Sequence, residues 1–136
     1  MQINPYLNFG GNCEEAFKFY ETVLGGSIVM LVRSSETPMA DMFPPDWHDK
    51  IMHIRMVVGD AVIMGSDAPP PYFEKPAGFS VSIIVDTPEK AETTFAALSV
   101  GGTVKMAMEE TFWAQRFGML IDKFGIHWMV NCEKSM

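Results

Sequence analysis

The residues best suited to chemistry are a histidine and an arginine within an apolar segment. His53 and Arg55 alternate with apolar side chains in residues 51–58. Successive strand residues point to opposite faces, so the two share one face. An imidazole can act as a general base, a metal ligand or a binding group, and a guanidinium pairs with carboxylate or phosphate. The pair indicates a site for an anionic ligand. Two purely structural alternatives stay open. The histidine could be hydrogen-bonded within the sheet, and the arginine could be paired with one of the 17 acidic residues.

The same alternation adds candidates from three other segments. Polar residues alternate with apolar ones in residues 5–9 and 79–85, and near the C-terminus His127 shares a face with Met129. These segments supply the further candidates Tyr6, Asn8, Ser80, Ser82 and His127. His48, in a proline-rich segment, is interpreted as a surface residue. No nucleophile–base arrangement, phosphate loop or dinucleotide-binding motif occurs, so no catalytic residue is assigned.

The first half of the chain predicts a β-α-β-β-β order. Strands are expected at 5–9, 27–33, 51–58 and 61–64, with a hairpin turn at 59–60. A helix is expected between Asn12 and the glycine pair at 25–26. Asn12 stands at the N-cap and Glu15 lies three residues later, which is the spacing of a capping box.

The second half repeats this order after a proline-rich linker. Strands are expected at 79–85, 103–108, 115–121 and 126–131, and a helix from Thr87 to the glycine pair at 101–102. A shift of about 75 residues superposes the two helices and their glycine stops, so we interpret the halves as duplicates. The sequence predicts one domain over 1–136, with module one at about 1–66, the linker at about 67–77 and module two at about 78–134.

The expected fold is α+β. Two βαβββ modules would form a curled mixed sheet around a shared cleft, with the helices outside, and such a cleft suits a small molecule. The segment 34–50 is long for a plain connection and carries several apolar residues. It is interpreted as either a lid over the cleft or a dimer contact.

Charge and composition exclude several kinds of partner. The formal net charge is −7 and the ten basic residues are scattered, which argues against nucleic acid and anionic membranes. No apolar run is long enough for a membrane helix and the N-terminus lacks signal-peptide features, so we expect a cytoplasmic protein. Cys13 and Cys132 belong to no metal-ligand spacing and are expected to be free thiols.

Four motifs resemble PhnB-like members of the vicinal-oxygen-chelate superfamily, which includes glyoxalases, bleomycin resistance proteins and extradiol dioxygenases. The motifs lie at residues 5–20, 52–53, 112–118 and 122–128. The resemblance implies paired βαβββ modules, often a homodimer, and in many relatives a divalent metal held by four His, Glu or Gln side chains. Trp113 and Gln115 fall in the third motif, near the expected cleft mouth, and join the predicted ligand-binding residues.

The positions that correspond to the implied metal ligands depart from that pattern. They hold Asn4 or Pro5, Ile63 or Met64, Ser80, and Met129. Thioethers suit soft cations, and isoleucine binds no metal. We therefore expect no metal and no other cofactor.

Three functions follow from the sequence, and whether the protein is an enzyme stays open. The first is binding of a small organic molecule in the cleft of a homodimer, and Arg55 favours an anionic ligand. The second is a metal-dependent lyase, isomerase or dioxygenase with relocated ligands, among them His53 and His127. The third is a non-catalytic structural dimer.

Overall fold

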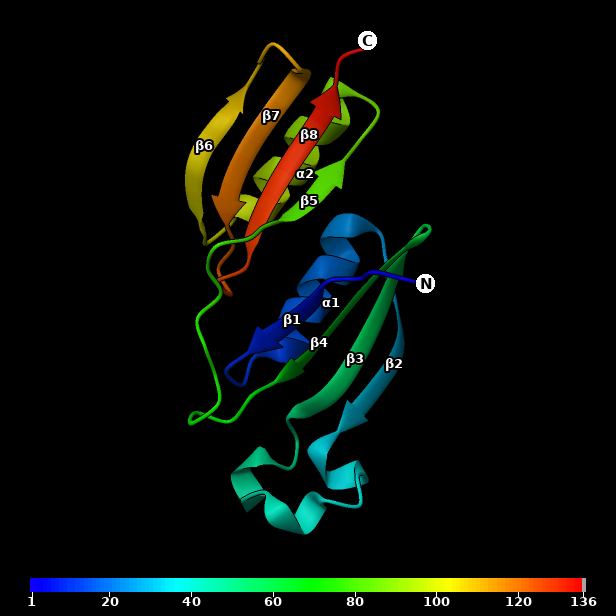
Figure 1. Ribbon diagram of the computed structural model, residues 1–136, viewed down its shortest axis with the longest axis vertical. Helices are drawn as coiled ribbons and strands as arrows, with labels where there is room; N and C mark the ends of the chain where they lie inside the picture. Colours follow the sequence, from blue (N-terminus) through cyan, green and yellow to red (C-terminus); the bar gives the residue numbers. More distant parts are fainter. Residues whose placement is uncertain (136) are drawn as a thin grey trace. The chain divides into compact units, whose positions relative to one another are not determined.

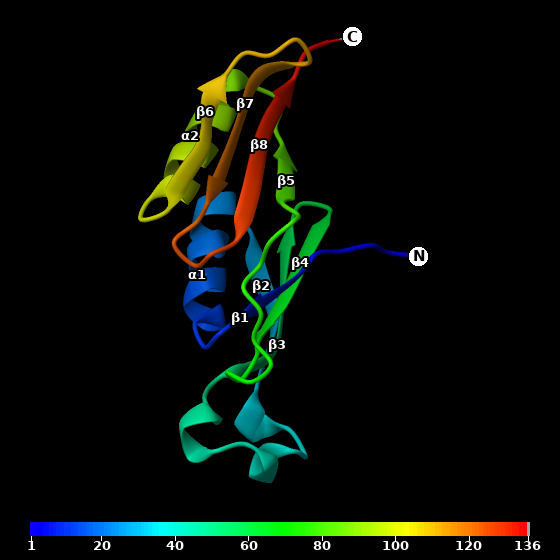
Figure 2. The same cartoon turned by 60° about the vertical axis from the view of Figure 1, so that its left-hand side comes forward.

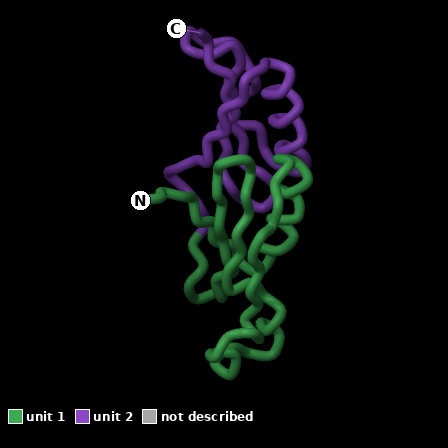
Figure 3. Tube along the Cα trace, turned by 90° about the vertical axis from the view of Figure 1, so that its right-hand side faces the viewer, with its two compact units in different colours: residues 1–74 green, residues 75–136 purple. Residues whose placement is uncertain are grey.

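The computed structural model describes residues 1–135, which form two compact units (Figure 3). Unit 1 covers Met1–Glu74, and unit 2 begins at Lys75. Each unit contains one long helix and one four-stranded mixed sheet. The expected α+β fold with two βαβββ units is therefore confirmed, while the shared cleft stays a prediction.

The sheet of unit 1 has the strand order β1-β4-β3-β2. β1 pairs with β4 in parallel, and the other pairs are antiparallel. Helix α1 lies against one face of this sheet (Figure 1). The elements are β1 (Tyr6–Phe9), α1 (Cys13–Leu24), β2 (Ser27–Arg33), β3 (Ile51–Val58) and β4 (Ala61–Asp67).

Unit 2 repeats this topology with the order β5-β8-β7-β6. β5 again pairs in parallel with the last strand, β8, and α2 lies against one face of the sheet. The elements are β5 (Val81–Ile84), α2 (Pro88–Ser99), β6 (Thr103–Glu109), β7 (Ala114–Ile121) and β8 (His127–Glu133).

The apolar core of each unit lies between its helix and its sheet. In unit 1 the buried side chains include Leu7, Phe9, Phe17, Ile54 and Met56, and in unit 2 they include Phe95, Leu98, Leu120, Trp128 and Val130. Strand residues alternate between this core and the opposite sheet face, as the sequence pattern predicts. We call the face that the helix does not cover the open face of each unit.

The two helices begin in different ways. Thr87 is the N-cap of α2, and its hydroxyl accepts the backbone N–H of Lys90 at 3.1 Å, as expected. Asn12 occupies the N-cap of α1, but its side chain makes no capping hydrogen bond, so the predicted capping box is wrong. A different residue contributes at this end of the helix, because the Asp67 carboxylate accepts the backbone N–H of Cys13, the first residue of α1, at 3.0 Å.

The connections differ from simple loops in two places. β4 continues three residues beyond its predicted end, so Asp67, which we assigned to the linker, is the last residue of a strand. The segment 34–50 forms three short 3-10 turns, η1 (Ser34–Glu36), η2 (Ala40–Met42) and η3 (Pro45–Trp47), beyond the ends of β2 and β3 (Figure 2). Among the described residues, no helix has the length and apolar character that crossing a membrane requires.

Candidate functional site

A row of four side chains crosses the open face of unit 1. The strand register aligns Tyr6 with Met64, Met64 with Arg55, and Arg55 with Met30, one residue from each strand. Directly opposed residues on adjacent strands point to the same face and lie within contact distance of each other. Arg55 therefore lies in the middle of the sheet, between two thioether side chains.

Tyr6 and His53 meet on this same face. The Tyr6 hydroxyl and His53 Nδ1 form a hydrogen bond of 3.2 Å, in which the histidine tautomer decides which group donates. Their rings are stacked, with centroids 5.8 Å apart and planes at 26°. The contact joins β1 to β3 across β4, so two residues 47 positions apart in the chain form one polar group.

Arg55 has no carboxylate partner among residues 1–135, although it is half-buried. The other two arginines are both paired, Arg33 with Glu14 at 2.8 Å and Arg116 with Glu92 at 3.0 Å. A guanidinium cannot lose its charge at physiological pH, and removing it from water without an anion is unfavourable. Arg55 is thus a cation that the described chain leaves without a counter-ion.

The predicted site residues divide between the two units. Tyr6, Asn8, His53 and Arg55 all lie on the open face of unit 1. Of the other five, Ser82 and His127 lie on the open face of unit 2, Ser80 precedes β5 and Trp113 precedes β7. Gln115 is exposed, and its Nε2 donates to the Glu133 carbonyl at 3.0 Å.

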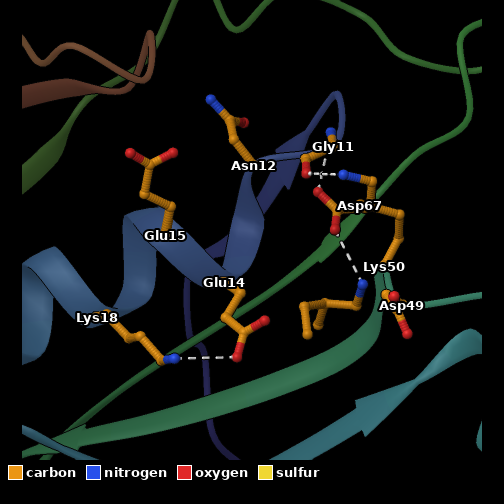
Figure 4. A pocket seen from close by; sticks show the side chains of 9 residues that line it. Gly11, Asn12, Glu14, Glu15, Lys18, Asp49, Lys50 and Asp67 are labelled. Carbon is orange, nitrogen blue, oxygen red and sulfur yellow. Dashed lines mark hydrogen bonds and ion pairs between the residues drawn. The ribbon is translucent and has the colours of Figure 1, made fainter. Parts of the chain in front are cut away.

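A second candidate is a cavity of about 450 Å³ at the start of α1 (Figure 4). Its lining residues are Gly11, Asn12, Glu14, Glu15, Lys18, Asp49, Lys50, Ile51 and Asp67. The Asp67 carboxylate accepts three backbone N–H groups, and the Lys50 ammonium donates to the Gly11 carbonyl at 2.8 Å. The side chains of Asn12 and Glu15 point away from Asp67.

Glu14, at the edge of this cavity, is held by two cations. Both of its carboxylate oxygens accept from the Arg33 guanidinium, at 2.8 and 2.9 Å, and Lys18 lies 3.2 Å away. The hydrogen bond from Arg33 is the main reason that the pKa of Glu14 falls to about 2. Glu14, Lys50 and Asp67 already have partners within unit 1, so we interpret these side chains as stabilising the fold. We therefore place the candidate site on the open face instead.

Comparison with known proteins assigns the family. Residues 1–131 match the protein family described as 3-demethylubiquinone-9 3-methyltransferase. The chain belongs to this family. The match does not by itself assign a reaction to the chain, because one fold supports many functions.

Family members and structural neighbours resemble the chain over nearly its whole length. Protein YjdN of Escherichia coli is 34% identical over 145 residues, covering 99% of this chain and 97% of YjdN. The crystal structure of protein PA1353 from Pseudomonas aeruginosa is 48% identical, covers 99% of both chains and has a TM-score of 0.90. A PhnB protein from Bacillus cereus is 25% identical, covers 97% of this chain and 99% of its own, and has a TM-score of 0.81.

More distant structures show the fold alone. A glyoxalase/bleomycin resistance protein/dioxygenase family enzyme from Burkholderia phytofirmans is 18% identical, with a TM-score of 0.64, and covers 95% of this chain and 97% of its own. This likeness shows a shared fold, and membership of the predicted superfamily stays a prediction.

The donor atoms at the implied metal positions do not fit a hard divalent cation. Asn4 or Pro5 precedes β1 and Ser80 precedes β5, while Ile63 or Met64 lies on β4 and Met129 on β8. Ile63 is buried, so Met64 is the open-face residue of that alternative. Mg²⁺, Mn²⁺ and Zn²⁺ prefer carboxylate, imidazole or thiolate ligands. Residues 1–135 contain no group of three or more His, Cys, Asp or Glu side chains placed to hold a metal. That the chain binds no hard divalent metal stays a prediction.

Sequence reasoning missed the partners that lie far apart in the chain. Alternation placed Arg55 and His53 on one sheet face, but nothing local indicated that Met30 and Met64 flank the guanidinium. The bond between Arg33 and Glu14 was missed for the same reason. The only sequence signal for the methionines was their high count of 12.

Proposed function

We propose that the chain binds a small organic anion on the open face of unit 1, without the hard divalent metal that the resemblance implies. Arg55 pairs with the anionic group, and the hydrogen-bonded Tyr6 and His53 form a polar contact beside it. The observation that carries the proposal is the half-buried Arg55 guanidinium, which has no carboxylate partner among the described residues.

The surroundings of Arg55 indicate the kind of ligand. Its two neighbours in the row, Met30 and Met64, are apolar and polarisable, and Met30 is 47% exposed. The guanidinium fork matches a carboxylate or a phosphate group. The ligand class is therefore a small molecule in which a carboxylate or phosphate is attached to an apolar body.

Benzoate and phenyl phosphate are the simplest probes of this class. Titration of either into ¹⁵N-labelled protein should shift the amide signals of Tyr6, His53 and Arg55. Arg55→Gln should weaken binding by about tenfold or more, because a hydrogen bond to a charged group contributes about 1.5–3 kcal/mol. Arg116→Gln is the matched control, since Arg116 is paired with Glu92 in unit 2.

Two outcomes would contradict the proposal. Equal affinity of the wild type and Arg55→Gln would remove Arg55 from the site. Stoichiometric Zn, Mn, Ni or Fe in protein purified without chelator, lost in His53→Ala and His127→Ala, would replace the metal-free function with a metal-dependent lyase, isomerase or dioxygenase.

The homodimer and the cytoplasmic location belong to the same proposal. Sedimentation velocity should give the mass of two chains, and cell fractionation should recover the protein in the cytoplasmic fraction. On the segment 34–50, Met39 and Met42 are 48% and 78% exposed. If this segment is a dimer contact, a charged residue in place of Met42 should lower the affinity of the dimer. If the segment is a lid, the same substitution should lower the affinity for the ligand.

A further inference from the structure

Three methionines form a row across the open face of unit 2. The register aligns Met106 with Met119 and Met119 with Met129, so adjacent strands β6, β7 and β8 each contribute one side chain. The fourth member of the row is Ser82 on β5. Met106 is 46% exposed, and Met119 and Met129 are half-buried, so the row borders solvent.

The duplicated row in unit 1 differs at one decisive position. There Met64 and Met30 occupy the places of Met129 and Met106, but Arg55 stands where unit 2 has Met119. A guanidinium repels a cation from the middle of the row in unit 1. The row in unit 2 contains no charged side chain, and three of its four members end in thioethers.

A thioether is a soft donor that coordinates soft monovalent cations and is a poor ligand for Mg²⁺, Mn²⁺ or Ca²⁺. Directly opposed residues on one sheet face have Cβ atoms about 4.5–5.5 Å apart. The flexible methionine side chain has three rotatable bonds, so the two outer residues can lean over the central one. Three sulfur atoms can thus converge on one ion above Met119.

We propose that Met106, Met119 and Met129 form a binding site for a soft monovalent cation, Cu(I) or its redox-inert counterpart Ag(I). The site supplies three neutral sulfur ligands, and binding involves no change in oxidation state. Its residues differ from those of the anion site proposed for unit 1. Met129 is also one of the positions that correspond to the implied metal ligands, but three thioethers suit a soft cation and not a hard one.

The test uses the full-length protein labelled with ¹³C at its methionine methyl groups. Addition of silver nitrate in chloride-free buffer should shift three of the 12 methionine signals and saturate at one ion per chain. Cu(I), supplied anaerobically with a chromophoric Cu(I) chelator as competitor, should bind with the same stoichiometry and shift the same signals. Mg²⁺ and Mn²⁺ should shift none of them.

Leucine substitutions remove the sulfur and keep the apolar volume. Met119→Leu should weaken Ag(I) binding at least about tenfold, because even groups that only orient a metal ligand contribute about 10- to 100-fold to affinity. Met106 lies on the exposed edge strand β6, so Met106→Leu should lower the affinity for Ag(I) without affecting folding. Met64→Leu is the matched control, since Met64 holds the equivalent place of Met129 in unit 1, and it should retain full affinity.

The methyl signals also separate this site from binding by the thiols. Cys13 and Cys132 are both buried, and Ag(I) captured by either would leave the three methionine signals unchanged. The signals of Met106, Met119 and Met129 are assigned from the leucine variants, because each variant lacks one of them. Full Ag(I) affinity in both Met119→Leu and Met106→Leu would overturn the proposal. Saturation by Ag(I) without shifts of these three signals would overturn it too. The two proposals are tested independently. If Arg55→Gln did not affect anion binding, the function proposed for unit 1 would fail, but the Ag(I) site in unit 2 would not.

Discussion

The backbone N–H of Cys13 donates to Asp67 Oδ1 at 3.0 Å, which ties the first turn of α1 to the last residue of β4. The same oxygen accepts the N–H of Gly11 at 3.0 Å, and Oδ2 accepts the N–H of Ile51 at 2.9 Å. One buried carboxylate therefore fixes the start of α1, the turn after β1 and the start of β3. Tyr6 lies on β1, which leads into this turn, and His53 lies on β3.

Asp67→Asn should destabilise the protein. Asparagine retains one carbonyl oxygen but places an NH₂ group where a backbone N–H already donates, so a buried donor loses its acceptor. The free energy of unfolding, measured by urea denaturation, should fall by about 1–3 kcal/mol.

Asn12→Ala tests the same interpretation from the other side. The Asn12 side chain makes no capping hydrogen bond, so this substitution should change the free energy of unfolding by no more than about 0.5 kcal/mol. A larger loss, close to that of Asp67→Asn, would mean that Asn12 caps the helix in solution.

The ion pair between Glu14 and Arg33 should make stability depend on acid pH. Hydrogen bonding by Arg33 lowers the pKa of Glu14 from 4.5 to about 2. The folded state therefore gains stability that is fully present above pH 4.5 and is lost as pH falls through about 2. Because the Glu14 side chain is 30% exposed, we expect this contribution to be at most about 1 kcal/mol.

The measurement compares urea denaturation of the wild type and Glu14→Gln from pH 7 to pH 2. The difference in the free energy of unfolding should be constant above pH 4.5 and shrink toward zero at pH 2. Glu15→Gln removes the same charge from the adjacent, exposed position and serves as the control. A difference that grows as pH falls would contradict the assignment of Arg33 as the partner.

The elements were predictable because their signals are local. The glycine pair at 25–26 ends α1, and Gly25 adopts φ 67°, a conformation that favours glycine. Thr87 and Pro88 open α2 as expected. The alternation of Leu7 and Phe9 with polar residues also assigned the correct strand faces.

The contacts between strands were not predictable from local patterns. The rows through Arg55 and Met119 depend on the register of four strands, and edge strands β2 and β6 both contain register shifts that no sequence motif marks. The failure at Asn12 has the same origin. The first N–H of α1, that of Cys13, donates to Asp67, a residue 54 positions away that the prolines beside it led us to place in a linker.

The thiol of Cys13 should be inert in the native protein. Burial, followed by the nearby charges of Asp67 and Glu14, raises the pKa of this thiol far above its usual range. Since the thiolate is the reactive form, and Cys132 is also buried, neither cysteine should react with Ellman's reagent at pH 8 before unfolding. Both should react in denaturant, and one rapid equivalent in native buffer would contradict the buried placement of Cys13 or Cys132.

Gly65 allows the close approach of β4 to β1 and α1. A Cβ atom at this position would lie 2.7 Å from Phe17 Cε1 and 2.8 Å from the Leu7 carbonyl oxygen. Gly65→Ala should therefore lower the free energy of unfolding by about 1–3 kcal/mol, the range of an overpacked core. A double-mutant cycle with Phe17→Leu separates the two contacts, because the smaller side chain relieves the clash with the ring but leaves the backbone oxygen in place. Partial rescue is the expected result. Full rescue would place the whole cost on Phe17, and a neutral Gly65→Ala would show that β1 and β4 are not paired as closely as the register of Leu7 with Gly65 requires.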